Sequence, residues 1–183
     1  MGRDKALLPW GSTDLLGHAL ARLLVLTDDV RILCGSGVRY ADRGVPVEPD
    51  LLDHAGPLAG VLTGLQVAHG RAGLFLGVDL PFVPVALLAH LAEVVGDFDA
   101  AVPVPAGGPE PLCAAYGGGS LEAVRRRVDA GDLRMTSFWP DVRVQEVGPA
   151  ELAAFGDPDV LFLNVNTPED YERALGLREG LTS

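Results

Sequence analysis

Apolar positions along the chain follow two spacings, which alternate from one segment to the next. Short continuous apolar runs have the length of buried strands, whereas longer segments repeat apolar residues at helical spacing. This alternation is typical of a mostly parallel sheet covered by helices, so the pattern predicts an α/β fold. The predicted strands are 30–34, 45–47, 74–78, 100–104, 112–116, 142–147 and 161–165. The predicted helices are 15–27, 58–68, 85–95, 121–128, 133–138, 151–155 and 168–175.

Local signals refine several of these elements. Ser12 or Thr13 can cap the first helix, and Pro57 suits the first position of the second. The run 74–78 is continuously apolar, which predicts a central strand buried on both faces. The stretch 105–111 is predicted to be a mobile loop.

Length and hydropathy limit the organisation of the chain. Its 183 residues suit one domain, 1–183, and show no internal repeat or low-complexity linker. No apolar run approaches the roughly 18 residues of a membrane span. The first residues lack the apolar region of a signal peptide. We therefore expect a cytoplasmic protein without a membrane partner.

Charge argues against nucleic acid as a partner. The formal net charge is -11, and acidic residues are spread along the whole chain. Such a surface repels nucleic acid and anionic membranes. The only basic run, 125–127, falls on a predicted helix, where consecutive residues point in different directions. We interpret it as a solvated face.

Cysteine and histidine give no sign of a metal or disulfide site. Cys34 and Cys113 lie inside apolar runs without a paired spacing, which predicts buried free thiols. No metal-ligand spacing relates the histidines, which are His18, His54, His69 and His90.

Lys5 is the only lysine, against thirteen arginines. A compact ammonium kept at one position is what a phosphate-facing cation requires. The alternative is a solvated surface charge near a terminus.

Polar residues at the carboxyl ends of strands are the candidates for binding, because ligands of open parallel sheets bind there. Asp79 follows the strand 74–78, and Pro81 ends it. A carboxylate in this position can hold Mg²⁺ against ligand phosphates. The alternative is a cap for the next helix, although Asp79 stands rather far ahead of it.

A second strand end carries Asn164 and Asn166, which alternate and would point to one side. They can share a ligand or simply tie loop backbone together. Thr167 before Pro168 is a capping arrangement. The third candidate is the segment Gly56, Pro57, Leu58, Ala59 and Gly60, where glycine permits close approach to a ligand and free N–H groups open the helix.

In order along the chain, MGRDKALLPW, GPLAG, GVDLPF, EPLCAAY and FLNVNTPEDY resemble the molybdenum cofactor guanylyltransferases. The resemblance covers nearly the whole chain. The first, second and last of these motifs are fairly specific, whereas DLPF occurs in relatives that use other nucleotides. The resemblance implies a Rossmann-like three-layer sandwich of the nucleotide-diphospho-sugar transferase type.

The same resemblance implies roles for individual residues. Lys5, helped by Arg3, would contact nucleotide phosphates, and Asp79 would bind Mg²⁺ and nucleotide. Asp50, in preference to Asp53, would contact guanine. The nucleotide site would also include Gly56, Pro57 and Gly60. Asn164 and Asn166 would lie in the pterin region.

The start of the chain departs from the family pattern. The family begins with a strand and a glycine-rich loop of the form LAGGxSxRMG, and this chain starts at the Met-Gly that closes it. We expect the natural protein to extend about twenty residues upstream, the length of a strand plus loop. Without that strand, two strand edges should remain unpaired, which is costly against a net stability of about 5 to 15 kcal/mol.

The activity that the resemblance implies is transfer of GMP from GTP to molybdopterin, with Mg²⁺ as cofactor and release of pyrophosphate. Proteins of molybdenum cofactor biosynthesis, or acceptor proteins, are implied partners. Two alternatives stay open. One is a related transferase that moves CMP or AMP to a pterin or sugar phosphate, and the other is a nucleotide-binding protein without catalysis.

Overall fold

The computed structural model describes residues 4–35, 39–50 and 56–182, with only the backbone of 181 and 182. Its main sheet has the strand order β5-β7-β6-β8, from β5 (Gly73–Leu76), β7 (Cys113–Tyr116), β6 (Ala100–Pro103) and β8 (Val144–Val147). β6 and β8 are parallel, while β7 runs antiparallel to both of its neighbours. β5, β6 and β8 therefore share one direction, and the predicted mostly parallel sheet is confirmed.

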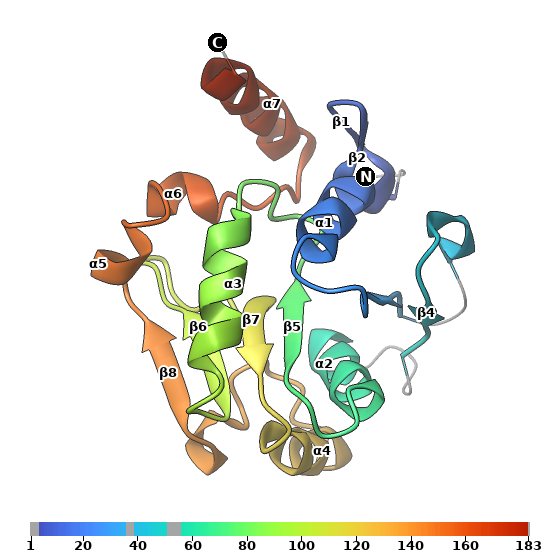
Figure 1. The fold of residues 1–183 in the computed structure, drawn as a ribbon, viewed down its shortest axis with the longest axis vertical. Coiled ribbons are helices and arrows are strands. Elements are labelled where there is room, and N and C mark those ends of the chain that lie inside the picture. Colours follow the sequence, from blue (N-terminus) through green and yellow to red (C-terminus); the bar gives the residue numbers. More distant parts are fainter. Residues whose placement is uncertain (1–3, 36–38, 51–55, 183) are drawn as a thin grey trace.

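Helices cover both faces of this sheet, because alternate strand residues point to opposite sides. Ala101 and Ala115 pack in a cluster with α3 (Val85–Val94). Ala114 and Tyr116 pack instead with α2 (Gly56–Val67) and α4 (Ser120–Asp129). Figure 1 shows α3 crossing the near face. The three-layer sandwich is thus present.

A smaller parallel sheet of β3 (Ile32–Leu33) and β4 (Val47–Glu48) lies beside the main sheet. The N-terminal segment forms a short 3-10 helix, η1 (Lys5–Leu7), and a hairpin of β1 (Pro9–Trp10) and β2 (Thr13–Asp14). α1 (Leu15–Leu24) follows directly.

The cap of α1 differs from the prediction. Asp14, not Ser12 or Thr13, is the N-cap, and its Oδ1 accepts a hydrogen bond from the Gly17 N–H at 2.8 Å. Thr13 is instead paired within β2. A carboxylate one residue later serves the helix equally well, because Asp ranks with Ser among capping residues.

The carboxyl-terminal third contains two wrong predictions. No α-helix forms at 133–138, where residues 135–138 form a turn that leads into η3 (Trp139–Asp141). No strand forms at 161–165, because Pro158 and the capping side chain of Asp157 start a short helix, α6 (Pro158–Leu161), which leads into an extended loop. The remaining helices are η2 (Ala41–Arg43), α5 (Pro149–Leu152) and α7 (Pro168–Thr182).

β5 is less buried than the sequence predicts. All of its residues are half-buried, whereas those of β6 and β7 are fully buried. Among the described residues, β5 pairs only with β7, and β3 pairs only with β4. The side of β5 that faces away from β7 is therefore a strand edge, and so is the side of β3 that faces away from β4.

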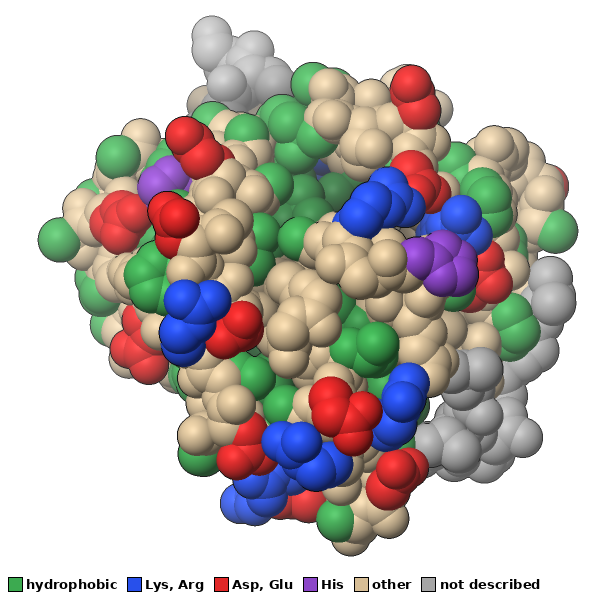
Figure 2. All heavy atoms as spheres, turned by 60° about the horizontal axis from the view of Figure 1, so that its bottom comes forward, with side chains coloured by type: hydrophobic (Ala, Val, Ile, Leu, Met, Phe, Trp, Pro, Cys, Tyr) green, Lys and Arg blue, Asp and Glu red, His purple; other side chains and the backbone are tan. Residues whose placement is uncertain are grey.

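The basic run 125–127 and the two cysteines are placed as the sequence predicts. Arg125, Arg126 and Arg127 pair with Glu122 or Asp141, and Figure 2 shows basic side chains lying beside acidic ones on the face that it presents. Cys34 and Cys113 are buried, and neither takes part in a disulfide within the described structure, as predicted. Within the described ranges, no helix has both the length and the apolar character that crossing a membrane requires.

Candidate active site

Lys5 brings together side chains from opposite ends of the chain. Its Nζ lies 2.6 Å from Oδ2 of Asp79 and 3.1 Å from Oδ1 of Asn166. η1 supplies the lysine, the turn after β5 supplies the aspartate, and the segment before α7 supplies the amide. Asp4 fixes η1, because its Oδ1 accepts a hydrogen bond from the Ala6 N–H at 3.1 Å. A cation, a carboxylate and an amide thus meet at the carboxyl end of β5.

Asp79 does not cap the following helix. The N-cap of α3 is Pro84, so the capping alternative is excluded. The Asp79 side chain is 16% exposed, and its backbone carbonyl accepts a hydrogen bond from the Val165 N–H at 2.9 Å. This bond joins the turn after β5 to the segment that carries Asn166.

Side chains of α1 hold the turn that follows Asp79 in place. The buried Arg22 donates from Nη1 to the carbonyls of Leu80, at 2.9 Å, and Val83, at 2.7 Å. Nε2 of His18 lies 2.8 Å from the carbonyl oxygen of Pro81. Burial lowers the pKa of Arg22 to about 10, so the guanidinium is still charged at neutral pH. Side chains of α1 therefore contact the backbone carbonyls of this turn, while the Asp79 carboxylate lies in the candidate site.

Asp50 lies near the first turns of α2. Its Oδ1 is buried without a hydrogen-bond partner, and a Cβ built on Gly60 would lie 3.6 Å from this atom. Burial raises the pKa of Asp50, although a backbone hydrogen bond with Gly35 opposes the shift. A buried acceptor without a donor is costly, so Asp50 is suited to accept hydrogen bonds from a ligand.

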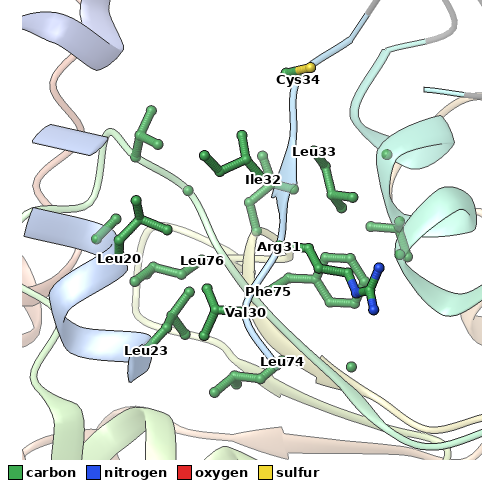
Figure 3. Close-up of a pocket in the computed structure, with 18 of the residues that line it drawn as sticks. Leu20, Leu23, Val30, Arg31, Ile32, Leu33, Cys34, Leu74, Phe75 and Leu76 are labelled. Atoms are coloured by element: carbon green, nitrogen blue, oxygen red, sulfur yellow. The ribbon is translucent and has the colours of Figure 1, made fainter. Parts of the chain in front are cut away.

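These residues share one groove with a volume of about 1010 Å³. It runs between β3 and β5, with α1 on one side and α2 on the other (Figure 3). The predicted site residues that line it are Lys5, Asp50, Gly56, Pro57, Gly60 and Asp79. The structure thus brings together every predicted nucleotide-site residue that it describes.

The remaining predicted site residues that the structure describes are not among those that line the groove. Asn166 joins the site through Lys5, whereas Asn164 is half-buried and does not share this contact. The prediction that both amides project from one strand is wrong, since no strand forms there. Thr167 does cap the next helix: its Oγ1 accepts from the Asp170 N–H at 3.1 Å, and Asp170 accepts in turn from the Thr167 N–H at 2.8 Å. Arg3, Asp53 and His54 lie outside the described residues.

Glu110 is a site residue that the sequence did not reveal. It lies just before β7, where its N–H donates to the Pro103 carbonyl at 2.9 Å and its carbonyl accepts from the Cys113 N–H at 3.0 Å. Half-burial and the negative charge of Asp79 raise the pKa of Glu110. Two carboxylates therefore face the same end of the sheet.

The donor set fits a hard dication. Asp79 and Glu110 offer carboxylate oxygens, the ligands that Mg²⁺ prefers. Among residues 4–35, 39–50 and 56–182, no group of three or more His, Cys, Asp or Glu side chains could hold a metal ion. A site of one or two carboxylates suits Mg²⁺, which keeps waters and takes further oxygens from substrate phosphates.

Comparison with known proteins gives a consistent result. Residues 1–141 match the family model described as the MobA-like NTP transferase domain. The chain is 31% identical to a probable molybdenum cofactor guanylyltransferase of Carboxydothermus hydrogenoformans, over 96% of this chain and 88% of the relative. It is 37% identical to the molybdenum cofactor guanylyltransferase of Rhodopseudomonas palustris, over 96% and 85%.

A solved structure shows the same fold. The molybdopterin-guanine dinucleotide biosynthesis protein A of Archaeoglobus fulgidus superimposes with a TM-score of 0.83 at 22% identity, covering 98% of this chain and 92% of that one. The Rossmann-like architecture predicted from the sequence is therefore confirmed.

Proposed function

Because the chain belongs to the MobA-like NTP transferase domain family, we propose that it transfers GMP from GTP to molybdopterin and releases pyrophosphate. The observation that carries this proposal is the junction of Lys5, Asp79 and Asn166 at one mouth of a groove whose wall includes Asp50 and Gly60. Both names of the curated relatives specify a guanylyltransferase.

In the proposed reaction, an oxygen of the terminal phosphate of molybdopterin attacks the α-phosphorus of GTP. The bond from the α-phosphorus to the oxygen that bridges it to the β-phosphate breaks, and that oxygen leaves with pyrophosphate. Such a transfer depends on positioning and on neutralisation of charge, so the protein needs no nucleophile of its own. The buried thiols accordingly have no part in it.

Lys5 would supply positive charge to the departing pyrophosphate. Its side chain is 38% exposed, so it can turn from Asp79 toward a phosphate without leaving the groove. Arg3 is proposed to assist it. Asp50 would accept hydrogen bonds from the guanine edge, since its free Oδ1 is matched by the N–H donors of that base.

Asp79, with Glu110 beside it, would hold Mg²⁺, and the ion would supply neutralisation of phosphate charge. The first turn of α2, which begins with Gly56 and Pro57, would present its backbone N–H groups to the nucleotide. Pro57 itself has no N–H to donate. Asn164 and Asn166 are proposed to contact the pterin, with Asn166 placed next to Lys5.

The test is pyrophosphate release with molybdopterin as the acceptor, measured with and without Mg²⁺ and with GTP, CTP or ATP. Mg²⁺-dependent release with GTP alone is the expected result. Preference for CTP or ATP would assign the chain to a sister transferase. GTP binding without release would support the non-catalytic alternative.

Asp79→Asn gives a sharper form of this test. It keeps the size of the side chain but removes the charge that holds both Lys5 and the metal, so release should fall by about a hundredfold or more. Asp132→Asn is the matched control, because Asp132 pairs only with the exposed Arg134 among the described ion pairs. Equal loss in both variants would refute a specific role for Asp79.

A further inference from the structure

The segment 39–43, which lies between β3 and β4, contacts two carboxylates on either side of the only lysine. Asp4 comes directly before Lys5 and is the N-cap of η1. Asp14 is the N-cap of α1, the helix that follows the hairpin of β1 and β2. Each carboxylate forms a hydrogen bond and an ion pair with the segment 39–43. The amino-terminal elements around Lys5 are therefore held by this segment as well as by their own caps.

The two carboxylate oxygens of Asp4 have different partners. Oδ1 accepts a hydrogen bond from the Ala6 N–H at 3.1 Å, and this bond caps η1. Oδ2 accepts a hydrogen bond from the Tyr40 hydroxyl at 2.5 Å and lies 3.6 Å from Nη1 of Arg39. A carboxylate that is bonded at both oxygens keeps one plane, because turning it would weaken both hydrogen bonds. The hydroxyl of Tyr40 thus fixes the cap of the turn that carries Lys5.

Tyr40 is held in position by both its backbone and its side chain. Its φ angle of 64° lies in the left-handed region, which is strained for a bulky residue. The side chain packs against the apolar cluster that contains Ala6 and Leu16. Burial and the Asp4 carboxylate raise the pKa of Tyr40 to about 12, so the hydroxyl keeps its proton at neutral pH and stays a donor. The strained backbone is therefore found at a residue whose hydroxyl contacts the cap of η1.

Asp14 anchors the same segment to α1. It caps that helix by accepting a hydrogen bond from the Gly17 N–H at 2.8 Å. Its two oxygens also accept from the guanidinium of Arg43, at 3.2 Å and 2.6 Å. This bidentate pair is largely shielded from solvent, since 22% of the Arg43 side chain and 17% of the Asp14 side chain are exposed. The segment that carries Tyr40 is therefore fixed to α1 independently of its contact with Asp4.

Lys5 depends on outside support because η1 is short. The turn has three residues, and a single 3-10 turn does not by itself offset the conformational entropy that its residues lose. The lysine side chain adds a flexible stem, and 38% of it is exposed. A shift of the backbone at η1 therefore moves the ammonium as well. A displacement of about 1 Å is enough to slow a reaction by about a hundredfold.

We propose that Tyr40 is a positioning residue for Lys5. Its hydroxyl orients the Asp4 carboxylate, the carboxylate fixes the turn η1, and that turn places the Lys5 ammonium beside Asp79. Tyr40 is not among the described residues that line the groove, whereas Lys5 is. The hydroxyl therefore acts through Asp4 and needs no contact with substrate. The use of Lys5 in phosphate transfer rests on the proposed function, but the placement of Lys5 by Tyr40 does not.

The experiment uses Lys5 as its own probe, because the protein contains no other lysine. Isotope-labelled lysine gives side-chain NMR signals from one residue, and these signals report its surroundings without any turnover. Tyr40→Phe removes the hydroxyl and keeps the ring. We expect the Lys5 signals to move toward those of Asp79→Asn, in which the ion pair is lost. Amide exchange at Ala6 should become faster by about tenfold, because its hydrogen bond to Asp4 weakens.

Asp4→Ala removes the carboxylate itself and decides the question if Tyr40→Phe folds poorly. It should move the Lys5 signals at least as far, and the double variant should match Asp4→Ala alone, since both changes act through one contact. Tyr116→Phe is the matched control, because that hydroxyl also donates one hydrogen bond, to the Pro111 carbonyl at 2.8 Å. The Lys5 signals should keep their positions in the control. Equal movement in both tyrosine variants would refute a specific role for Tyr40.

Turnover separates this inference from the proposed function. Tyr40→Phe should lower kcat for pyrophosphate release by about tenfold and change KM for GTP little, because Lys5 acts on charge that develops during the transfer. Movement of the Lys5 signals in a protein that transfers no nucleotide would leave the positioning role intact and would refute the guanylyltransferase. Unmoved Lys5 signals in a folded Tyr40→Phe protein would overturn the positioning role, even where the transfer itself is confirmed.

Discussion

The Nζ atom of Lys5 lies 2.6 Å from Oδ2 of Asp79, although 74 positions separate the two residues in the chain. The pair joins the only lysine of the protein to the carboxylate proposed to bind a metal ion. In the proposed reaction, substrate would separate this pair, because Asp79 would hold Mg²⁺ and Lys5 would contact the phosphates. The ion pair thus keeps both groups in place before the substrate arrives.

We expect Lys5→Ala to lower pyrophosphate release by about a hundredfold or more without unfolding the protein, because the pair is partly exposed and contributes little to stability. Lys5→Arg should restore only part of the rate, since a planar guanidinium replaces a compact ammonium. Steady-state rates and thermal melting would be measured together. Arg134→Ala, at an exposed ion pair, is the control. Full activity in Lys5→Ala would remove Lys5 from the mechanism.

The convergence at this pair was only partly predictable. Asp79 was identified because the carboxyl ends of parallel strands form the binding edge of a sheet. Asn166 was identified for the wrong local reason, because the predicted strand is a loop, yet the loop still delivers its amide to Lys5. Glu110 is not predicted, because its place near Asp79 depends on the pairing of β5 with β7, and local hydrophobic spacing does not give strand order.

The burial of β5 differs from the prediction made from its apolar sequence. The run 74–78 reads as a central strand, yet β5 is half-buried and lies at the end of its described sheet. Residues 73–76 of β5 all line the groove, which leaves their apolar side chains partly exposed. The mismatch between apolar composition and exposure is therefore a property of the groove.

Asp50→Asn should raise the stability of the protein at neutral pH and weaken its binding of GTP. Burial raises the folded-state pKa of Asp50 above its ordinary value, so the folded protein binds the proton more tightly than the unfolded chain. The contribution of Asp50 to the free energy of unfolding is therefore most favourable at low pH, and it is lost as pH rises through the folded-state pKa of Asp50. At neutral pH the asparagine variant should melt at a higher temperature than the parent, and the difference should shrink toward pH 4 and below.

The same variant should bind GTP less well, because the amide replaces a charged acceptor that is proposed to contact the guanine donors. We expect the preference for GTP over ATP to fall by about tenfold. Calorimetric titration with each nucleotide measures this ratio. An unchanged ratio, with the stability gain present, would place Asp50 away from the base.

Arg22 should act as a positioning residue for Asp79. Arg22→Met keeps much of the buried volume but leaves the carbonyls of Leu80 and Val83 without their donor. We expect a lower melting temperature and a lower kcat, together with a higher Mg²⁺ requirement, because the turn that carries Asp79 loosens. Arg22→Lys should recover stability more than rate, since a rotatable ammonium on a shorter stem would not hold both carbonyls in the geometry that Nη1 of the planar guanidinium gives them. A fall in stability with unchanged Mg²⁺ dependence would limit Arg22 to a structural role.

Glu110 precedes β7 at the end of the sheet where Asp79 follows β5, and the charge of Asp79 helps to raise the pKa of Glu110. If both carboxylates serve one ion, Glu110→Gln should raise the Mg²⁺ concentration for half-maximal rate by about tenfold, since a neutral amide oxygen is a weaker ligand. Removal of a half-buried negative charge should at the same time stabilise the protein without ligand at neutral pH, because burial and Asp79 both raise the pKa of Glu110. Glu122→Gln, on the exposed part of α4, is the matched control. A stabilised Glu110→Gln protein with unchanged Mg²⁺ dependence would show that Asp79 binds the ion without Glu110.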